Sequence, residues 1–449
     1  MKSFLLISLL FLGFVSSIQA QEKERKIDLS PEIHFRTFWM NTDYPSRELK
    51  SDYALGMSLY SGVNLTFNQK FSFSAGYRSF ANAISSDYWL PDPITGQSNR
   101  YEAGLFDLLD TRDRFFGRLE RLSITYTLPK FGLSLGRMDV NTDWVNAQDG
   151  RLSPTVMEGI KVWFKPSSYW KFNFWAINRL NIRGSSEWLG IGETIGIFPQ
   201  GRNISGKPGN YFQNTSSKWI GIAEADRSLG ESSKLHFSMT HAQNIFNTYG
   251  LTFENNRKLT SKTLLFGIQS GFQHGLGNGG NEDSNLRYKD PKDVNYSISG
   301  RIGLKKSNWT THLNVLHVGG KGRWLSPREW GKDAWYTFIP RERNEGFSKV
   351  NAVVGYGEYR FAKVPLSIYL HSGIHWLPDV SNAAENKYAM PSYQQTNLGF
   401  RFQSKRIKGL DVHLILVSKQ ALNAENLTPN QIYNKVELIH FNGIINWKW

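Results

Sequence analysis

Residues 131–165, FGLSLGRMDVNTDWVNAQDGRLSPTVMEGIKVWFK, contain the stretch that decides the fold. Apolar side chains occupy every second position at both of its ends, at residues 131–135 and 160–164. This period of two is typical of β-strands with one apolar face. Between them lies a segment rich in Asp, Asn, Gly and Pro that is too long for a tight hairpin turn. We therefore predict two strands joined by a long loop over residues 139–155.

The chain begins with the features of a secretory signal. Lys2 precedes an apolar run, and small residues lead to Ala20 before a polar stretch begins. We predict a signal peptide over residues 1–20, followed by a single domain over residues 21–449. A retained membrane anchor is the alternative, but the apolar run is short for a spanning helix.

Composition narrows the classes of partner. The chain has no cysteine, so disulfides, thiol nucleophiles and thiolate metal sites are excluded. Without Lys2 the formal net charge falls from +15 to +14. This basic balance indicates an anionic partner, which at this point includes nucleic acid, lipid head groups and small acidic solutes.

Aromatic residues make up 14% of the chain, yet its mean hydropathy is −0.42. No second apolar run approaches the length of a spanning helix. A membrane barrel combines these properties because lipid-facing and water-facing residues alternate along each strand. An exported, soluble all-β protein is the alternative.

Alternating stretches recur along the whole chain. Short connections alternate with long ones, as the turns and outer loops of a bacterial barrel do. We predict an all-β fold, a transmembrane antiparallel β-barrel of about 18 strands in which residues 139–155 are an inward-folded third outer loop. The predicted strands lie at residues 32–40, 53–67, 71–80, 115–128, 131–138, 156–165, 170–179, 218–227, 234–243, 249–254, 262–273, 295–305, 309–318, 349–360, 366–377, 397–404, 410–418 and 434–449.

The last predicted strand ends on an aromatic residue. Ile445, Trp447 and Trp449 share one of its faces, while Asn446 and Lys448 share the other. This pattern resembles the C-terminal signature of outer-membrane barrel proteins, which their assembly machinery recognises. We therefore expect an outer-membrane location, contact with membrane lipids and lipopolysaccharide, and binding of the barrel assembly machinery at Trp449.

Arg151-Leu152-Ser153-Pro154, followed by Gly159, resembles a motif of the OprD family of outer-membrane porins. In that family the third outer loop carries Ser-Arg-Leu-x-Pro, with a Gly five residues after the Pro. Here Gly150 stands where the family often has Ser. The resemblance implies 18 strands, a constriction of inward-folded loops, and a ladder of basic side chains that guides small, usually carboxylate-bearing solutes. The motifs of the resemblance are specific only around residues 136–159, so it does not identify the solute of this chain.

Side chains opposite the apolar face of each strand should face the pore, although a register error of one residue would reverse each assignment. Two roles stay open for Arg151. Its guanidinium grips solute carboxylates, or it ties the loop to the wall through Asp149 or a barrel carboxylate. The predicted pore wall and constriction consist of Arg121, Asp143, Trp144, Asp149, Arg151, Lys161, Trp163, Lys171, Trp175, Arg179, Arg301 and Arg401.

These features predict a porin for passive, selective diffusion of small anionic or carboxylate-bearing solutes. Trp144, Trp163 and Trp175 leave an oligosaccharide-selective porin as an alternative, although for Trp163 and Trp175 we favour packing against the inward-folded loop. A barrel enzyme and an adhesin are the rival classes, and the ten histidines form no recognisable catalytic constellation. We expect no enzymatic activity, no cofactor, no metal site and no nucleic-acid partner.

Overall fold

The strands of this protein run antiparallel, and the first pairs with the last. The computed structural model describes residues 27–45, 47–148, 150–198 and 201–449, so the predicted signal peptide lies outside the described residues. β1 (Ile27–Asp43) pairs with β2 (Asp52–Phe67) along one edge and with β19 (Leu438–Lys448) along the other. This pairing closes the sheet into a barrel, which leaves no long free edge exposed.

The remaining strands follow in chain order. β8 is a two-residue addition that pairs with β7, and β7 also pairs directly with β9. Leaving β8 aside, 18 strands form the ring, which confirms the predicted fold class. They are β3 (Phe71–Ser85), β4 (Phe115–Leu128), β5 (Phe131–Asp139), β6 (Val156–Phe164), β7 (Trp170–Asn181), β8 (Leu189–Gly190), β9 (Ile220–Leu229), β10 (Ser233–Ala242), β11 (Phe246–Lys258), β12 (Thr263–Gly275), β13 (Val294–Lys305), β14 (Trp309–Lys321), β15 (Val350–Arg360), β16 (Leu366–Trp376), β17 (Tyr393–Gln403) and β18 (Leu410–Ala421).

Most differences from the predicted strands lie at strand ends. The short segment 249–254 belongs to β11, which is longer than its pattern indicated. The predicted strand 434–449 starts late because the helix α2 (Pro429–Ile432) precedes it, and Asn434 and Glu437 both adopt positive φ angles. Such angles interrupt an extended backbone, so β19 begins only at Leu438.

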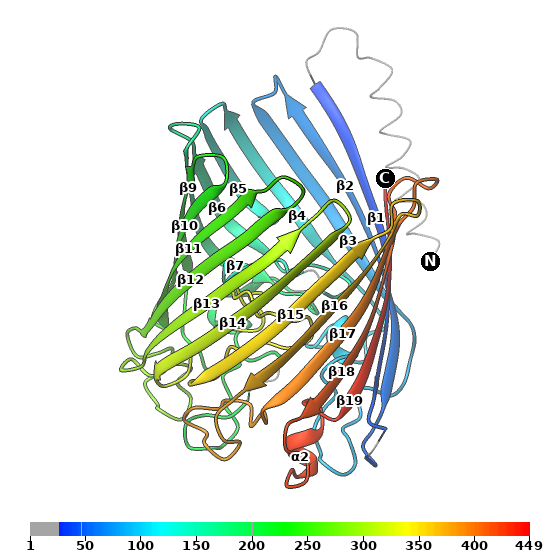
Figure 1. The fold of residues 1–449 in the computed structure, drawn as a ribbon, viewed down its shortest axis with the longest axis vertical. Coiled ribbons are helices and arrows are strands. Elements are labelled where there is room, and N and C mark those ends of the chain that lie inside the picture. The colour runs from blue at the N-terminus through cyan, green and yellow to red at the C-terminus, as the bar shows by residue number, and fades with distance from the viewer. Residues whose placement is uncertain (1–26, 46, 149, 199–200) are drawn as a thin grey trace.

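Short turns and long connections lie at opposite ends of the barrel (Figure 1). The end of β19 lies at the end with the short turns, and α2 lies among the long connections at the other end. The connection between β10 and β11, residues 243–245, is short although it lies with the long ones. The predicted alternation of connection lengths therefore holds with one exception.

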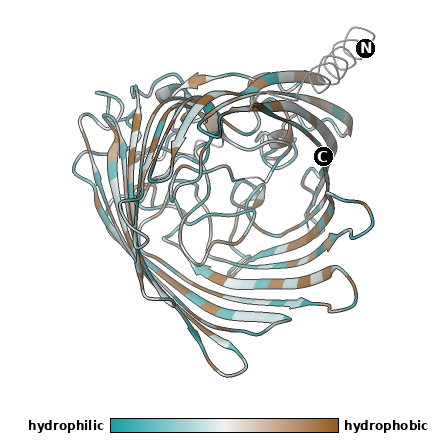
Figure 2. Ribbon diagram, turned by 90° about the horizontal axis from the view of Figure 1, so that it is seen from above, coloured by the Kyte–Doolittle hydropathy of each residue, from teal (hydrophilic) through white to brown (hydrophobic). Residues whose placement is uncertain are grey.

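Hydrophobic and hydrophilic residues alternate along the strands, as the brown and teal bands in Figure 2 show. On β13 the exposed Ile298 and Ile302 alternate with Ser297 and Ser299, which are buried. Apolar side chains outside and polar side chains inside are the arrangement of a membrane barrel. We call the face opposite the exposed apolar side chains the inner face. Among the described residues, no helix is long and apolar enough to cross a membrane.

Long connections contribute to the packing inside the ring, where Figure 2 shows chain segments that cross the interior. Trp144, Trp324 and Trp335 all come from such connections, and all three are buried. The ring centre of Trp144 lies 5.4 Å from that of Trp324 and 5.1 Å from that of Trp335. This packing connects residues 139–155 with residues 322–349.

Candidate functional site

Arg121 lies on β4 between two carboxylates. Its Nη1 donates to Glu32 at 3.0 Å, and its Nη2 donates to Asp139 at 2.6 Å. The next residue, Leu122, is exposed on the opposite face. The two ion pairs offset the charge of the guanidinium, so Arg121 attracts a passing anion less strongly than an unpaired arginine would.

β6 and β7 place Lys161, Trp163, Lys171 and Trp175 opposite exposed apolar side chains. The Nζ atom of Lys161 lies 5.6 Å from the ring centre of Trp175, within cation–π range. Trp163 covers Gly132 of β5, where a Cβ atom would overlap the indole. Trp175 is buried in an apolar cluster that includes Val140 and Val145. Trp175 therefore packs against protein and presents no open face for a sugar.

Arg179 departs from the predicted inner face. The prediction assumed an unbroken alternation along β7 from Lys171. The register between β6 and β7 shifts between Glu158 and Gly159, which is a β-bulge. Asn178 and Arg179 are consequently both exposed. The prediction that Arg179 continues the face of Lys171 is wrong, because a bulge adds one residue that a period-two pattern does not reveal.

Arg301 and Arg401 come from β13 and β17. Nε of Arg301 donates to Asn314 at 3.0 Å, and its guanidinium carbon lies 4.1 Å from the ring centre of Tyr336. Arg401 lies 3.7 Å from Glu358. Among the described residues, no carboxylate lies within ion-pair distance of Arg301, so its positive charge remains uncompensated.

Strand side chains hold residues 151–154 through their backbone. The donors lie on β1, β2 and β4, and each donates to a carbonyl: Arg36 to that of Arg151 (2.9 Å), Ser58 to that of Leu152 (2.9 Å) and Arg118 to that of Pro154 (2.8 Å). Earlier in the same segment, Asp143 accepts a hydrogen bond of 2.6 Å from Ser238 of β10. Asp149 lies outside the described residues. The segment is thus attached to strands on well-separated parts of the barrel wall.

Leu152 and Gly159 have structural reasons for their identity. Leu152 is fully buried in a cluster with Phe38 and Phe106. At Gly159, a Cβ atom would clash with the backbone carbonyl of Ala176 at the bulge. The Arg-Leu-Ser-Pro motif with its following Gly therefore specifies a packed leucine and a close approach of two strands.

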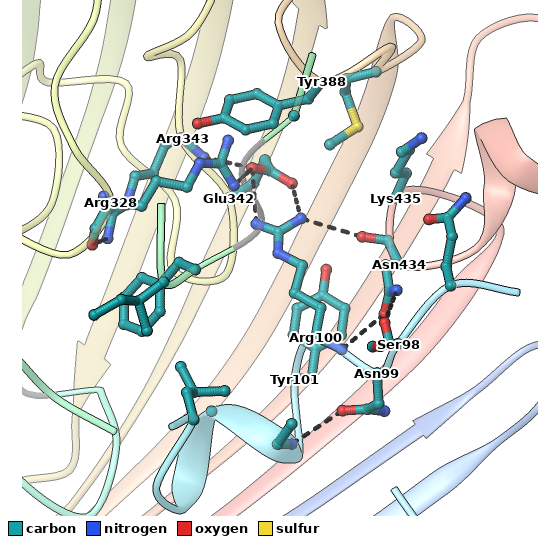
Figure 3. A pocket seen from close by; sticks show the side chains of 18 of the residues that line it. Ser98, Asn99, Arg100, Tyr101, Arg328, Glu342, Arg343, Tyr388, Asn434 and Lys435 are labelled. Atoms are coloured by element: carbon teal, nitrogen blue, oxygen red, sulfur yellow. Dashed lines mark hydrogen bonds and ion pairs between the residues drawn. The ribbon is translucent and has the colours of Figure 1, made fainter. Parts of the chain in front are cut away.

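A cavity of about 1050 Å³ lies beside this motif, and Figure 3 shows part of it. We call it the arginine cavity. Its wall comes from five connections, namely residues 86–114, 139–155, 182–219, 322–349 and 377–392, with further residues near α2. The arginines that line it are Arg100, Arg151, Arg183, Arg202, Arg328, Arg341 and Arg343.

Glu342 is the acidic centre of this cavity. It pairs with Arg100 at 3.3 Å, with Arg328 at 3.1 Å and with Lys419 at 2.6 Å, as Figure 3 shows for Arg100. Burial alone would raise the pKa of the Glu342 carboxyl, but these cations hold it well below its usual range. Arg328 also pairs with Glu345 at 2.6 Å. Arg100 and Arg328 are therefore compensated.

The other arginines of the cavity differ from Arg100 and Arg328 in the groups to which they donate. Within the described part of the chain, no carboxylate lies within ion-pair distance of Arg151, Arg183, Arg341 or Arg343. Nη1 of Arg151 donates to the carbonyl of Gly150 at 3.0 Å, and Nη1 of Arg341 donates to the same carbonyl at 3.1 Å. Arg343 donates to Gln148. Neutral acceptors do not cancel a charge, so the cavity holds an excess of positive charge.

Burial lowers the pKa of each of these guanidinium groups. The pKa of Arg341 and that of Arg343 fall to about 10. Burial, with Arg341 and Arg100 nearby, holds the pKa of Arg151 well below its usual range. Burial and the neighbouring Arg343 do the same for Arg183. An added anion would offset the cost of burying these charges and, at Arg151, Arg183 and Arg343, the repulsion by neighbouring arginines.

Sequence reasoning identified Arg151 but missed the other arginines of the cavity. Arg341 and Arg343 flank Glu342 in a long connection, which looks like an ordinary charged surface loop. One signal was present, because three tryptophans lie between residues 324 and 335 in the same connection. Aromatic residues at that density indicate a packed loop.

No protein-family model and no curated protein matches the sequence. Several solved structures match the chain in fold. The chain is similar to OccAB3 of Acinetobacter baumannii (TM-score 0.73, 13% identity), covering 94% of this chain and 99% of that one. It is also similar to a BenF-like porin of Pseudomonas fluorescens Pf-5 (0.70, 14%) and to OpdK of Pseudomonas aeruginosa with vanillate (0.69, 13%), each covering 94% of this chain and 98% of the other.

One of these neighbours, the BenF-like protein, is a porin. The likeness extends over nearly the full length of both chains, and the strand number and connection pattern agree with it. This chain therefore has the fold of the OprD-family porins, a closed antiparallel β-barrel.

Proposed function

We propose that this protein is an outer-membrane porin through which small anionic, carboxylate-bearing solutes diffuse passively. The observation that carries the proposal is a set of four arginines without a carboxylate partner among the described residues: Arg183 and Arg343, which are buried, and Arg151 and Arg341, which are partly buried. An unpaired buried charge is costly, and a solute carboxylate that enters the cavity offsets that cost. A guanidinium also offers two parallel donors that match a carboxylate.

Residues 139–155 form the constriction in this proposal. Their attachments to Arg36, Ser58, Arg118 and Ser238 support a path across the inside of the barrel. A second cavity, of about 550 Å³, is lined both by this segment and by strand residues that include Arg301. The segment thus contributes to both cavities, as a narrowing between two wider spaces would.

The basic wall is less uniform than the sequence predicted. Arg301, Lys161 and Lys171 supply charge along the solute path in this proposal, whereas Arg121 and Arg401 lie beside acids and contribute less. Arg179 is exposed on the other face and is not included. Anion preference therefore comes mainly from the arginine cavity.

For Arg151 we favour direct contact with the solute. Its alternative role, as a tie to the wall, would require a carboxylate partner. The described ranges hold no barrel carboxylate within ion-pair distance of Arg151, and they do not include Asp149, the other partner of such a tie; strand side chains hold the segment through its carbonyls. The guanidinium of Arg151 faces the arginine cavity beside Arg341.

Other functions have less support. Trp144 and Trp175 are buried, which leaves little aromatic surface for an oligosaccharide. One neighbour was solved with vanillate, which is a carboxylate. Contacts with lipopolysaccharide and recognition of Trp449 by the assembly machinery remain part of the proposal.

The test is a planar-bilayer recording of reversal potential in a salt gradient, with benzoate and the neutral benzamide as probe solutes. We expect wild type to prefer anions at low salt, where charges act over roughly 30 Å, and benzoate to reduce the current more than benzamide. Arg183→Gln with Arg343→Gln should lower both effects, and Arg112→Gln, an exposed arginine outside the cavity, should change neither. A cation preference in wild type would overturn the proposal.

A further inference from the structure

Three side chains that are far apart in the sequence meet where the segment 139–155 contacts the barrel wall. Asp143 comes from the segment, Glu224 from β9 and His236 from β10. One potential ligand atom of each lies within 4.8 Å of the others. The β9–β10 register pairs Asp226 with His236, so a fourth polar side chain adjoins the group.

His236 is oriented by that neighbour. Its Nδ1 atom lies 2.7 Å from the carboxylate of Asp226, which accepts the imidazole proton. Nε2 is buried, has no hydrogen-bond partner in the described chain, and lies 3.5 Å from Oδ1 of Asp143. A carboxylate behind one imidazole nitrogen, with the other nitrogen free, is the arrangement that positions histidine as a metal ligand.

Glu224 is the second independent indication of a ligand. It is only 7% exposed, and it makes no hydrogen bond or ion pair with any described residue. A carboxylate buried in this way needs a compensating cation. The lysines around Glu224 do not pair with it: Lys234 pairs with Asp226 at 2.9 Å, and neither Lys161 nor Lys171 makes an ion pair with Glu224.

We propose that Asp143, Glu224 and His236 bind a divalent transition-metal ion of the Zn²⁺ type. One imidazole and two carboxylates suit Zn²⁺, whereas Ca²⁺ prefers six to eight oxygens. At ligand bonds of roughly 2.0–2.2 Å, neighbouring donor atoms of a tetrahedral site lie roughly 3.4 Å apart, and the 3.5 Å between Nε2 and Oδ1 matches this. Asp143 also lines the cavity of about 550 Å³, which leaves a fourth position for water or solute.

The bound ion would join the segment 139–155 to β9 and β10. Ser238 already donates to the other oxygen of Asp143 and orients this carboxylate. A metal bond would strengthen the same attachment. The site goes beyond solute passage, and it contradicts the expectation of no metal site, which rested on sequence spacing alone.

The test is calorimetric titration of the full-length protein, free of any histidine tag, in detergent after chelator treatment. We expect one Zn²⁺ per chain, no comparable binding of Ca²⁺, and at least tenfold weaker Zn²⁺ binding in His236→Asn and Glu224→Gln. His241→Asn removes a histidine from the opposite face of the same strand and should bind as wild type does. Co²⁺ should give an absorption spectrum that changes in His236→Asn.

Folding of each variant is checked by its heat-modifiable mobility on gels, and the nearly isosteric Glu224→Gln serves if His236→Asn fails to fold. Two results would overturn the proposal. One is the absence of saturable Zn²⁺ binding by wild type, which would make the group an ion pair between protonated His236 and its acids. The other is unchanged binding in both variants, which would place the metal elsewhere.

Discussion

At the scale of single residues, the cavity depends on arginines that pair with no carboxylate in the described part of the chain. Arg100 and Arg328 share Glu342, whereas Arg151 and Arg341 share only the carbonyl of Gly150. A small acidic solute therefore meets guanidinium donors that no carboxylate of the described ranges occupies. This difference between compensated and uncompensated arginines decides which substitutions should affect solute binding.

We expect Arg151→Ala to weaken the block of the current by benzoate several-fold. The cavity then loses a guanidinium that can donate two parallel hydrogen bonds to one carboxylate. Arg151→Lys should retain the anion preference but not the affinity, since an ammonium supplies charge without the planar fork. Single-channel recordings with and without benzoate measure both effects. Equal, noisy gating in the two variants, with block unchanged, would instead assign Arg151 a purely structural role.

At the scale of elements, the β-bulge between β6 and β7 shapes the entry to the segment 139–155. Gly159 faces Gly136 of β5, which has a φ of +110°, and it approaches the backbone of Ala176 on β7. Two glycines side by side allow three strands to pass closely where the register shifts. The same shift moves Arg179 away from the inner face.

Gly159→Ala should therefore destabilise the barrel by about 1–3 kcal/mol, because its methyl group would overlap backbone and not a movable side chain. The temperature at which the folded band disappears on dodecyl sulphate gels measures this loss. Gly357→Ala on β15 is the matched control, since no described heavy atom lies within 4 Å of its added methyl group. Similar shifts in both variants would mean that the bulge tolerates a side chain.

At the scale of the whole molecule, charge within the connections makes selectivity depend on pH. Burial raises the pKa of Glu102 and that of Asp333 to about 7. Both carboxyls are thus neutral at pH 5.5 and charged at pH 8.5. Burial also lowers the pKa of Lys435 to about 8, so this lysine loses its charge over the upper part of that range.

Anion preference should consequently fall as pH rises from 5.5 to 8.5, because negative charge appears beside the cavity while positive charge is lost. Reversal potentials at the two pH values measure the change. Glu102→Gln combined with Asp333→Asn should reduce it, since the lysine contribution alone remains. An anion preference that rises with pH would contradict this assignment.

Closure of the barrel also belongs to the whole molecule. In β19, Trp447 pairs with Leu410 of β18 and with Phe35 of β1, so the end of the chain forms part of the seam. Deleting Trp447, Lys448 and Trp449 should prevent formation of the heat-modifiable species in membrane fractions. Substituting Lys448 alone with Gln should have little effect. A truncated chain that assembles normally would show that the seam forms without these residues.

The strand count, the order of the connections and the motif at residues 151–159 could be predicted from the sequence. The reason is physical, because a strand between lipid and water must alternate with a period of two, and the motif is local in the chain. The bulge that displaces Arg179 could not be predicted from the sequence, since one extra residue leaves the apolar–polar alternation on either side of it intact.

The arginine cavity and the Asp143–Glu224–His236 group were decided only by the tertiary structure. Their members come from connections and strands that lie far apart in the sequence, as Arg100 and Arg343 of the cavity do, and the sequence of a single connection does not indicate where its charged side chains will lie. Alternation along the chain determines which face a strand residue occupies. Only closure of the ring and packing of the long connections bring Arg151 beside Arg341, and leave both without an acid among the described residues.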